Sequence, residues 1–452
     1  MQLVNGQERA DLTLKFLAPE QADAQAKKLD VPAQVTRNLR PGQVRLLSRG
    51  AEGDVAVALP PADAAQARDV GAALVGLATD LGAQSVRVEE TAHADALALA
   101  ALAAGDRDAR YRAEARPGPA HLAVEGLPEA DLAFVKALAA GVRFARELVN
   151  APANLLNPAT LAREARSLEP LGADVDVWDG TEIEARGMGL LAAVAAGSAT
   201  GPRLIRVTLP ARGEATRIVA LVGKGVTFDT GGYSIKPAAG MTTMKGDMGG
   251  AAAVLGAMRA LAAARDRLPE GVEVRAYVPA AENMVGPHAM RPGDIYRAAN
   301  GKTVEVVNTD AEGRLILADA LAVACDEGAT EVVDVATLTG AKVVALGNDV
   351  AALYSTDAGL TTRLKASAEA CGEFVWELPL HAPYLKAFQR ETLADLRNAD
   401  MVPAGGSIKA ALFLREFVTR PWAHLDIAGN AMKEGQATGW GVGTLVGYVL
   451  GS

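Results

Sequence analysis

Hydrophobic residues recur at steps of three and four between positions 128 and 149, which is the spacing of one face of an α-helix. The apolar positions there are Leu132, Val135, Leu138, Val142, Ala145 and Val149. Earlier in the chain, short apolar runs at 44–47 and 54–59 predict β-strands. Ala-rich stretches at 62–81 and 92–104 predict helices. The chain therefore begins with a mixed α/β unit.

After residue 150 the pattern changes to short apolar strands that alternate with helical stretches. Strands are expected at 203–209, 218–222, 272–278, 303–307 and 331–336, and helices at 249–264 and 315–325. This alternation is typical of a largely parallel sheet covered by helices. Such sheets bind their ligands at the carboxyl ends of the strands.

A polar segment at 107–119, with several arginines and two prolines, separates the two patterns. A chain of 452 residues is long enough for two or three domains of roughly 100–200 residues each. We therefore predict a two-domain α/β protein. A smaller N-terminal α/β domain is expected at 1–120 and a connecting helix at 121–150. A larger C-terminal domain at 151–452 should contain a mostly parallel central sheet flanked by helices.

Composition excludes several classes of partner. A formal net charge of −9 disfavours binding to nucleic-acid phosphates, and 4% aromatic residues are too few for a base-stacking surface. Residues 1–16 do not follow the pattern of a signal peptide, and no run approaches the ~18 apolar residues of a membrane span. Two cysteines, Cys325 and Cys371, suit a reducing compartment. We expect a cytoplasmic protein with no membrane or nucleic-acid partner.

A glycine-rich segment at 223–250 carries the first candidate chemistry. It begins where an apolar strand ends, and Lys224, Asp229, Lys236 and Asp247 are spaced between its glycines. Charged residues in such loops are most often solvated on the surface. Single charges between glycines directly after a buried strand nevertheless favour a site, because glycine lets the backbone approach a ligand closely.

Phosphate-binding and nucleophile motifs do not fit the chain. The Gly-Lys-Thr at 301–303 is preceded by Tyr296 where a Walker loop needs glycine, and Phe228 occupies the third glycine position of a dinucleotide fingerprint. Neither a Gly-x-Ser-x-Gly elbow nor a His-Glu-x-x-His motif occurs. Nucleotide binding and serine hydrolase chemistry are therefore disfavoured.

A second cluster, Asp310 and Glu312, directly follows the expected strand at 303–307. Residues two apart at a strand end point the same way, so these carboxylates can converge. Arg314 could pair with them as a simple ion pair. With Asp229 and Asp247, however, four carboxylates lie in two strand-end loops, and one arginine cannot balance them. Several carboxylates are what a pair of divalent ions about 3.5–4 Å apart requires.

Histidine contributes little to this interpretation. The five histidines, His93, His121, His288, His381 and His424, are scattered without the spacing of metal ligands. His424 alternates with apolar residues and is expected in the core. A metal site in this chain should therefore consist mainly of carboxylates.

At the two charged segments the sequence resembles the leucyl aminopeptidase family of cytosolic dinuclear metallopeptidases, the M17 type. The matching stretches are 222–237, 244–252 and 308–321, with softer matches at 146–154, 282–284, 291–294, 337–341 and 422–429. The string Asn-Thr-Asp-Ala-Glu-Gly-Arg-Leu at 308–315 is highly specific. The resemblance covers the chain from about residue 146, so it implies that 151–452 is a catalytic aminopeptidase domain.

The resemblance also implies the roles of individual residues. The metal ligands would be Lys224, Asp229, Asp247, Asp310 and Glu312, with Asp229 and Glu312 bridging both ions. Lys236 and Arg314 would be the catalytic residues that do not bind metal. The cofactors would be two divalent ions, Mn²⁺ or Zn²⁺, and a bicarbonate held by Arg314 as general base. A neutral Lys224 is plausible beside two dications.

The expected activity is metal-dependent removal of the N-terminal residue, with leucine and other apolar residues preferred, from peptides that have a free amino terminus. The pocket for the first side chain would consist of Met244, Thr337, Leu338, Gly340 and Ala428. These residues could instead be ordinary core or helix-start positions. The family assembles as homohexamers, and a homohexamer is therefore expected from the resemblance alone.

Two other hypotheses belong to different functional classes. Some members of the family bind DNA, but the acidic composition and the lack of a basic run argue against this, apart from a local patch at 107–116. A non-catalytic structural relative is disfavoured because all five expected ligands are present.

Overall fold

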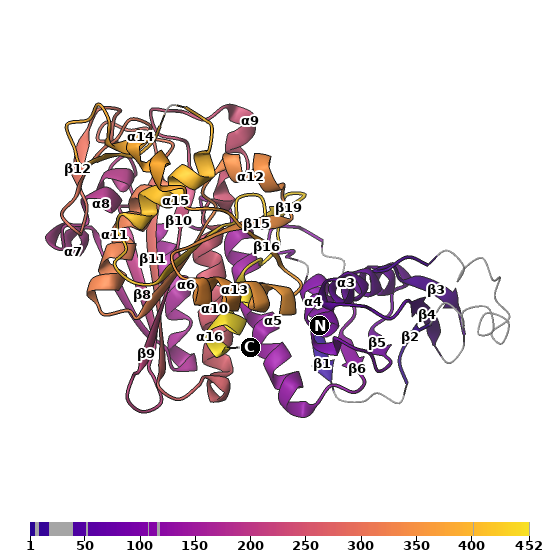
Figure 1. Cartoon of the computed structure of the whole chain (residues 1–452). Helices are drawn as coiled ribbons and strands as arrows, with labels where there is room; N and C mark the ends of the chain where they lie inside the picture. The colour runs from indigo at the N-terminus through magenta and orange to yellow at the C-terminus, as the bar shows by residue number, and fades with distance from the viewer. Residues whose placement is uncertain are drawn as a thin grey trace. The chain divides into compact units, whose positions relative to one another are not determined.

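The computed structural model describes residues 1–4, 9–17, 39–50, 53–106, 108–114, 118–400 and 402–451. The chain divides into two compact units. The smaller contains residues 1–143 together with 369–373, and the larger contains 144–368 and 374–452 (Figure 1). Residues 107 and 115–117, which belong to the expected polar segment at 107–119, lie outside the described residues.

The smaller unit is built on a six-stranded sheet in the order β1-β6-β5-β2-β4-β3. Its strands are β1 (Gln2–Val4), β2 (Leu12–Phe16), β3 (Arg45–Ser48), β4 (Asp54–Ala58), β5 (Ser85–Val88) and β6 (His121–Val124), and its helices are α3 (Ala64–Leu81) and α4 (Ala94–Gly105). All pairs are parallel except β3 with β4. Asp63 caps α3 by accepting a hydrogen bond from the Gln66 amide, and Gly82 ends it in the left-handed conformation at φ 72°.

The expected connecting helix at 121–150 starts later in the structure. Residues 121–124 form β6, which pairs in parallel with β1 and β5, and the helix α5 runs from Glu129 to Asn150. Leu122 is fully buried in this strand, so the apolar residues there belong to the sheet core. Pro128 directly precedes the helix, a position that suits proline because its missing N–H would be unpaired there.

The larger unit contains a nine-stranded sheet in the order β16-β15-β18-β14-β9-β11-β8-β7, with β10 also paired to β11. Its strands are β7 (Asp174–Trp178), β8 (Arg203–Leu209), β9 (Arg217–Gly223), β10 (Gly225–Asp229), β11 (Val272–Asn283), β14 (Glu331–Ala336), β15 (Val350–Ser355), β16 (Phe374–Glu377) and β18 (Trp422–Asp426). The centre, β18-β14-β9-β11, is parallel, whereas β15 with β18, β8 with β11 and β7 with β8 are antiparallel. The predicted mostly parallel central sheet is confirmed.

Helices cover both faces of this sheet. The helices that begin in the larger unit are α6 (Pro158–Arg166), α7 (Gly180–Ala185), α8 (Gly189–Ala195), α9 (Ala238–Met241), α10 (Gly249–Ala263), α11 (Gly313–Asp326), α12 (Gly340–Leu346), α13 (Ala358–Ala370), α14 (Lys386–Gln389), α15 (Gly406–Arg415) and α16 (Val442–Leu450). Ala220 and Val222 of β9 share one apolar core with α8, α11 and α15. Gly223, which points the opposite way, lies against α10, where an added Cβ would be 2.7 Å from the Ala251 Cα.

Two small sheets complete the larger unit. One consists of β12 (Ile295–Arg297), β13 (Thr303–Glu305) and β17 (Leu396–Arg397), and the other of β19 (Met432–Lys433) and β20 (Gln436–Ala437). The strand expected at 303–307 is thus shorter, and it lies outside the main sheet. Its pairing with β17 stops because the Asn398 side chain accepts the hydrogen bonds of the Val307 and Asn308 amides. Within the described ranges, no helix has the length and hydropathy needed to cross a membrane.

Candidate active site

Lys224 and Asp229 are placed by the junction of two strands. Lys224 lies between β9 and β10, and Asp229 is the last residue of β10. Both side chains are almost fully buried, at 3% and 1% exposure. The Lys224 side chain passes so close to the backbone of residue 313 that only glycine fits there, because a Cβ at Gly313 would lie 2.4 Å from the Lys224 Cε. The strand ends therefore direct a cation and a carboxylate into the same buried space.

The loop after β10 turns through Gly231 and Gly232, which have φ angles of 84° and 62° that favour glycine. A Cβ at Gly231 would lie 2.8 Å from Asp310 Oδ1, so the loop can approach this carboxylate only without a side chain there. The fully buried Thr309 joins the two loops, because its hydroxyl donates to the Gly231 carbonyl at 2.6 Å and accepts from the Ser234 amide at 2.7 Å.

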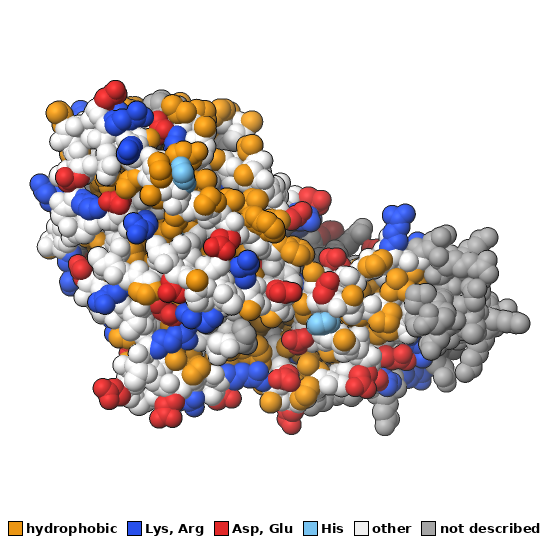
Figure 2. All heavy atoms as spheres, viewed as in Figure 1, with side chains coloured by type: hydrophobic (Ala, Val, Ile, Leu, Met, Phe, Trp, Pro, Cys, Tyr) orange, Lys and Arg blue, Asp and Glu red, His pale blue; other side chains and the backbone are white. Residues whose placement is uncertain are grey.

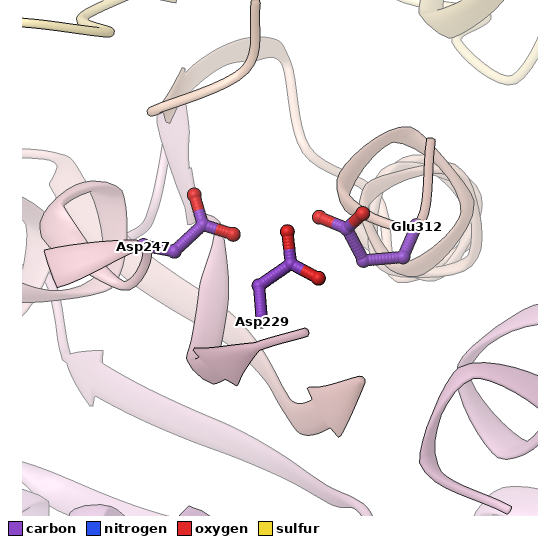
Figure 3. A group of neighbouring side chains, drawn as sticks. All are labelled: Asp229, Asp247 and Glu312. Carbon is purple, nitrogen blue, oxygen red and sulfur yellow. The ribbon is translucent and has the colours of Figure 1, made fainter. Parts of the chain in front are cut away.

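Asp247 and Glu312 each lie within two residues of the start of a buried helix. Asp247 follows the short 3₁₀ helix η2 (Met244–Gly246) and precedes α10, and Glu312 is the residue before α11. One carboxylate oxygen each of Asp229, Asp247 and Glu312 lies within 4.8 Å of the others, and all three residues are buried (Figure 3). In the part of the chain that the structure describes, this is the one group of acidic, histidine or cysteine side chains arranged to hold a metal ion.

Two lysines reach this carboxylate group from different sides. The Lys224 Nζ lies 2.8 Å from Asp247 Oδ2 and 3.0 Å from Glu312 Oε1. The Lys236 Nζ lies 2.8 Å from Asp229 Oδ2 and 2.6 Å from Asp310 Oδ1. The side chain of Lys236 is 18% exposed, whereas that of Lys224 is 3% exposed. Lys236 is therefore the lysine with access to solvent and to a bound molecule.

Burial and mutual repulsion dominate the electrostatics. Burial raises the pKa of Glu312 and of Asp247, and the nearby Asp229 carboxylate raises both further. Burial alone would lower the pKa of Lys224, but the surrounding carboxylates raise it above its ordinary value. The same opposition raises the pKa of Lys236. The group of acids therefore has a strong requirement for positive charge.

Arg314, in the first turn of α11, lies beside these acids. Burial lowers its pKa to about 10, although Glu312 and Asp426 oppose this shift. Its Nη1 donates to the Asn398 carbonyl at 3.0 Å. Among the described residues, the buried Arg314 Nε and the buried Glu312 Oε2 have no hydrogen-bond partner. An unpaired buried donor and acceptor in one site indicate room for further ligands.

The twelve site residues expected from the sequence all line one cavity of about 650 Å³. They are Lys224, Asp229, Lys236, Met244, Asp247, Asp310, Glu312, Arg314, Thr337, Leu338, Gly340 and Ala428. Lining residues that the sequence did not indicate include Asn308, Phe388, Ala431 and Met432. The side chains of the buried Asn283 and Asn398 hold the two ligand-bearing loops. Asn283 lies in the softer match at 282–284 but was given no role there, and the sequence did not indicate Asn398.

A model of the cytosol aminopeptidase family, catalytic domain, matches residues 143–446. The chain belongs to the cytosol aminopeptidase family. It is 43% identical over 443 residues to a probable cytosol aminopeptidase of Synechococcus sp. (strain CC9311), covering 91% of this chain and 88% of that one. It is 46% identical over 376 residues to another from Synechococcus sp. (strain WH7803), covering 80% and 75%.

Two solved structures are also similar to this chain. A mutant of tomato leucine aminopeptidase matches with a TM-score of 0.88 at 34% identity, covering 99% of this chain and 96% of that one. The bottromycin maturation enzyme BotP in complex with Mn matches with a TM-score of 0.85 at 35% identity, covering 97% and 99%. The resemblance deduced from the two charged segments is confirmed. The protein is an aminopeptidase, a hydrolase that acts at the amino terminus of peptides.

Proposed function

We propose that the protein is a dinuclear metal-dependent aminopeptidase that removes leucine and other apolar residues from peptides with a free amino terminus. The observation that carries this proposal is the buried group of Asp229, Asp247 and Glu312, whose carboxylate oxygens lie within 4.8 Å of one another. Two lysines contact this group, and one of them, Lys236, is partly exposed to solvent.

The donor set fits two divalent ions. Glu312 Oε2 is buried and has no hydrogen-bond partner among the described residues, and the pKa values of Glu312 and Asp247 are raised by burial and further by repulsion from neighbouring carboxylates. Divalent ions would relieve this repulsion, and carboxylates with one amine suit Mn²⁺ or Zn²⁺. The residues that would hold them are Lys224, Asp229, Asp247, Asp310 and Glu312. When bound, such ions polarise a carbonyl and lower the pKa of a shared water.

The other residues would bind and orient the peptide. Lys236 presents an ammonium to the cavity and would donate hydrogen bonds to the oxygen of the scissile carbonyl. Arg314 has a buried Nε without a partner among the described residues, and it would hold a bicarbonate ion expected to act as general base. Met244, Leu338, Gly340 and Ala428 give the cavity an apolar wall, which would receive an apolar first side chain.

Hydrolysis of a panel of aminoacyl anilides with Mn²⁺, with Zn²⁺ and with a chelator tests this function. We expect the metal to be required and leucyl anilide to be cleaved faster than charged analogues. Asp310→Ala and Glu312→Ala should lose bound metal and activity while the protein stays folded by circular dichroism. Undiminished metal binding in both variants would contradict the ligand assignment.

We also propose that the protein acts in the cytoplasm as a homohexamer, without a membrane or nucleic-acid partner. Its relatives are named cytosol aminopeptidases, which supports the location. Large apolar side chains of the larger unit, Val344 at 89% and Trp376 at 63% exposure, support association. Figure 2 shows apolar side chains on the visible surface of this unit. Light scattering should give a mass six times that of one chain, and a monomer at micromolar concentration would contradict the assembly.

A further inference from the structure

Lys342 is a fully buried lysine in the first turn of α12, outside the carboxylate group of the active site. Its ammonium donates to the Ala428 carbonyl at 2.8 Å, to the Gly347 carbonyl at 3.0 Å and to the side-chain oxygen of Asn430. An ammonium has three donors, so these three acceptors satisfy it completely. A buried charge needs such pairing, because its desolvation is otherwise costly.

The groups that Lys342 joins belong to two chain segments that line the same cavity. On α12, its neighbours Ala341 and Val343 line the cavity. Ala428 and Met432, in the segment that follows β18, also line it. The bond from Lys342 to the Ala428 carbonyl therefore connects α12 to the segment that follows β18.

Both the amide and the carbonyl of Ala428 are held by hydrogen bonds. Its amide donates to Asp426 Oδ1 at 3.2 Å, and its carbonyl accepts from Lys342. Asp426 Oδ1 also accepts a hydrogen bond from the Leu338 amide at 3.1 Å, so Asp426 holds the backbones of both Ala428 and Leu338. The buried Asn430 Nδ2 has no partner in the described part of the chain, so the side chain of Asn430 is oriented here by its oxygen, which faces Lys342.

We propose that Lys342 is a positioning residue that fixes the width of the pocket for the first side chain of the substrate, and so sets which first residues are accepted. The inference rests on the proposed function, which places Ala428 in the apolar wall that receives the first side chain. Burial lowers the pKa of Lys342 to about 8, while Asp426 and Asp349 oppose the shift. The ammonium persists there because its three acceptors are fixed in place.

Removal of the ammonium should loosen the pocket and leave the chemistry in place. Lys342→Met fills a similar volume but leaves the Ala428 carbonyl and Asn430 without their donor. The 428–432 segment can then move, and the pocket should distinguish side chains by size less well. We expect KM for leucyl anilide to rise, and the ratio of kcat/KM for leucyl over alanyl anilide to fall about tenfold, the low end of what such a pocket provides. The kcat for alanyl anilide and the metal content should stay within twofold.

The experiment compares Lys342→Met with Lys365→Met, a matched change at an exposed lysine of α13. Both variants are assayed with alanyl, leucyl and phenylalanyl anilides, and bound metal and Tm are measured. A purely structural lysine would lower Tm without changing the ratio between substrates. If Lys342→Met does not fold, Asn430→Ala removes one acceptor only and should change the ratio in the same direction by a smaller factor.

Ala428→Phe separates failure of this inference from failure of the proposed pocket. It should narrow the pocket and abolish the preference for leucine. If Ala428→Phe does so while Lys342→Met and Asn430→Ala keep the wild-type ratio, the role of Lys342 is overturned. If Ala428→Phe leaves leucyl anilide unaffected, the pocket assignment itself is wrong.

Discussion

The side-chain amide of Asn283 donates a hydrogen bond of 2.8 Å to Oδ1 of Asp229. The same side-chain amide donates to the Thr309 carbonyl at 3.0 Å. The backbone carbonyl of Asn283 accepts from the Thr230 hydroxyl at 2.8 Å. Asn283 is the last residue of β11 and is 1% exposed. One buried asparagine thus orients a proposed bridging ligand and fixes the distance between the two ligand-bearing loops.

Replacement of Asn283 should therefore weaken metal binding without removing a ligand. In Asn283→Leu, Asp229 loses the donor that fixes its orientation, and partners of this kind typically contribute about 10–100-fold in metal affinity. Isothermal titration of the metal-free protein with Mn²⁺ measures the effect, with the exposed Asn300→Leu as control. If Asn283→Leu keeps the wild-type affinity for Mn²⁺ while Asp229→Asn loses it, this hydrogen bond does not contribute to metal binding.

The two lysines of the site should be separable by experiment. Lys236 faces the cavity, so Lys236→Ala should lower kcat by about 10²–10³, the range for loss of one oxyanion donor, at unchanged metal content. Lys224 lies against Asp247 and Glu312, so Lys224→Ala should instead weaken one metal site. Steady-state kinetics together with metal analysis of both variants tests this. Loss of metal in Lys236→Ala with normal turnover of the metal-loaded enzyme would reverse the assignment.

Asn398 gives a prediction about the loop that carries Asp310 and Glu312. Its side-chain oxygen accepts from the Val307 amide at 2.9 Å, and its side-chain nitrogen donates to the Asn308 carbonyl at 2.6 Å. Asn398→Asp keeps the shape but removes this donor and places an oxygen against a carbonyl. We expect a loss of about 1–3 kcal/mol in the free energy of unfolding and a fall in kcat, because Arg314 is bonded to the same residue.

Urea unfolding and kinetics of Asn398→Asp measure both effects. Asn300→Asp makes the same change at an exposed position and should alter neither the free energy of unfolding nor kcat. A wild-type unfolding midpoint and wild-type kcat in Asn398→Asp would mean that the loop is held by other contacts.

The charged strings of the site could be predicted from the sequence because their chemistry is local. The strings 222–237 and 308–321 place charges among glycines within short segments, and the structure brings all of their expected residues to one cavity. The softer match at 282–284 contains Asn283 but did not reveal its role, and Asn398 could not be found in this way. Asparagine is common in loops, and Asn398 reaches Asn308 across 90 residues of chain. Only the tertiary structure shows that their amides bind the loops.

The fold was predicted where segments are long and periodic. Helices α10 and α11 and strands β8 and β14 lie within about two residues of their expected positions. Short strands were missed or merged, such as the four residues of β6, because alternation over four residues resembles the apolar face of a helix. The separate sheet of β13 could not be expected, since its partners β12 and β17 are three and two residues long.

A blocked amino terminus should prevent cleavage. The proposed ligands lie at the cavity that also contains the apolar wall, so the free amine of the first residue is expected to bind there beside the carboxylates. N-acetyl-leucyl anilide has no basic amine, and we expect its turnover to fall at least 10³-fold relative to leucyl anilide. Comparable rates for both compounds would indicate an endopeptidase or another amidase.

His424 and Asp334 form a buried pair in the core behind the site. The His424 Nδ1 lies 2.6 Å from Asp334 Oδ1, and the Trp422 indole donates to Asp334 Oδ2 at 2.7 Å. Burial alone would lower the pKa of His424, but Asp334, and more weakly Asp426, raise it above its ordinary value against the opposing charge of Arg314. A raised pKa in the folded state means that folding favours the protonated imidazole.

The stability that this pair contributes should therefore depend on pH in a defined direction. It is fully present below about pH 6.5, the pKa of an unfolded histidine, and is lost as pH rises through the higher pKa of the folded state. His424→Gln keeps a hydrogen-bond donor but cannot gain a proton. The difference in unfolding free energy between wild type and this variant should be largest near pH 6 and shrink towards pH 9, whereas the exposed His288→Gln should give no such trend. A difference that stays constant or grows with pH would mean that His424 is neutral in the folded protein, because only a protonated imidazole makes the pairing with Asp334 depend on pH in this way.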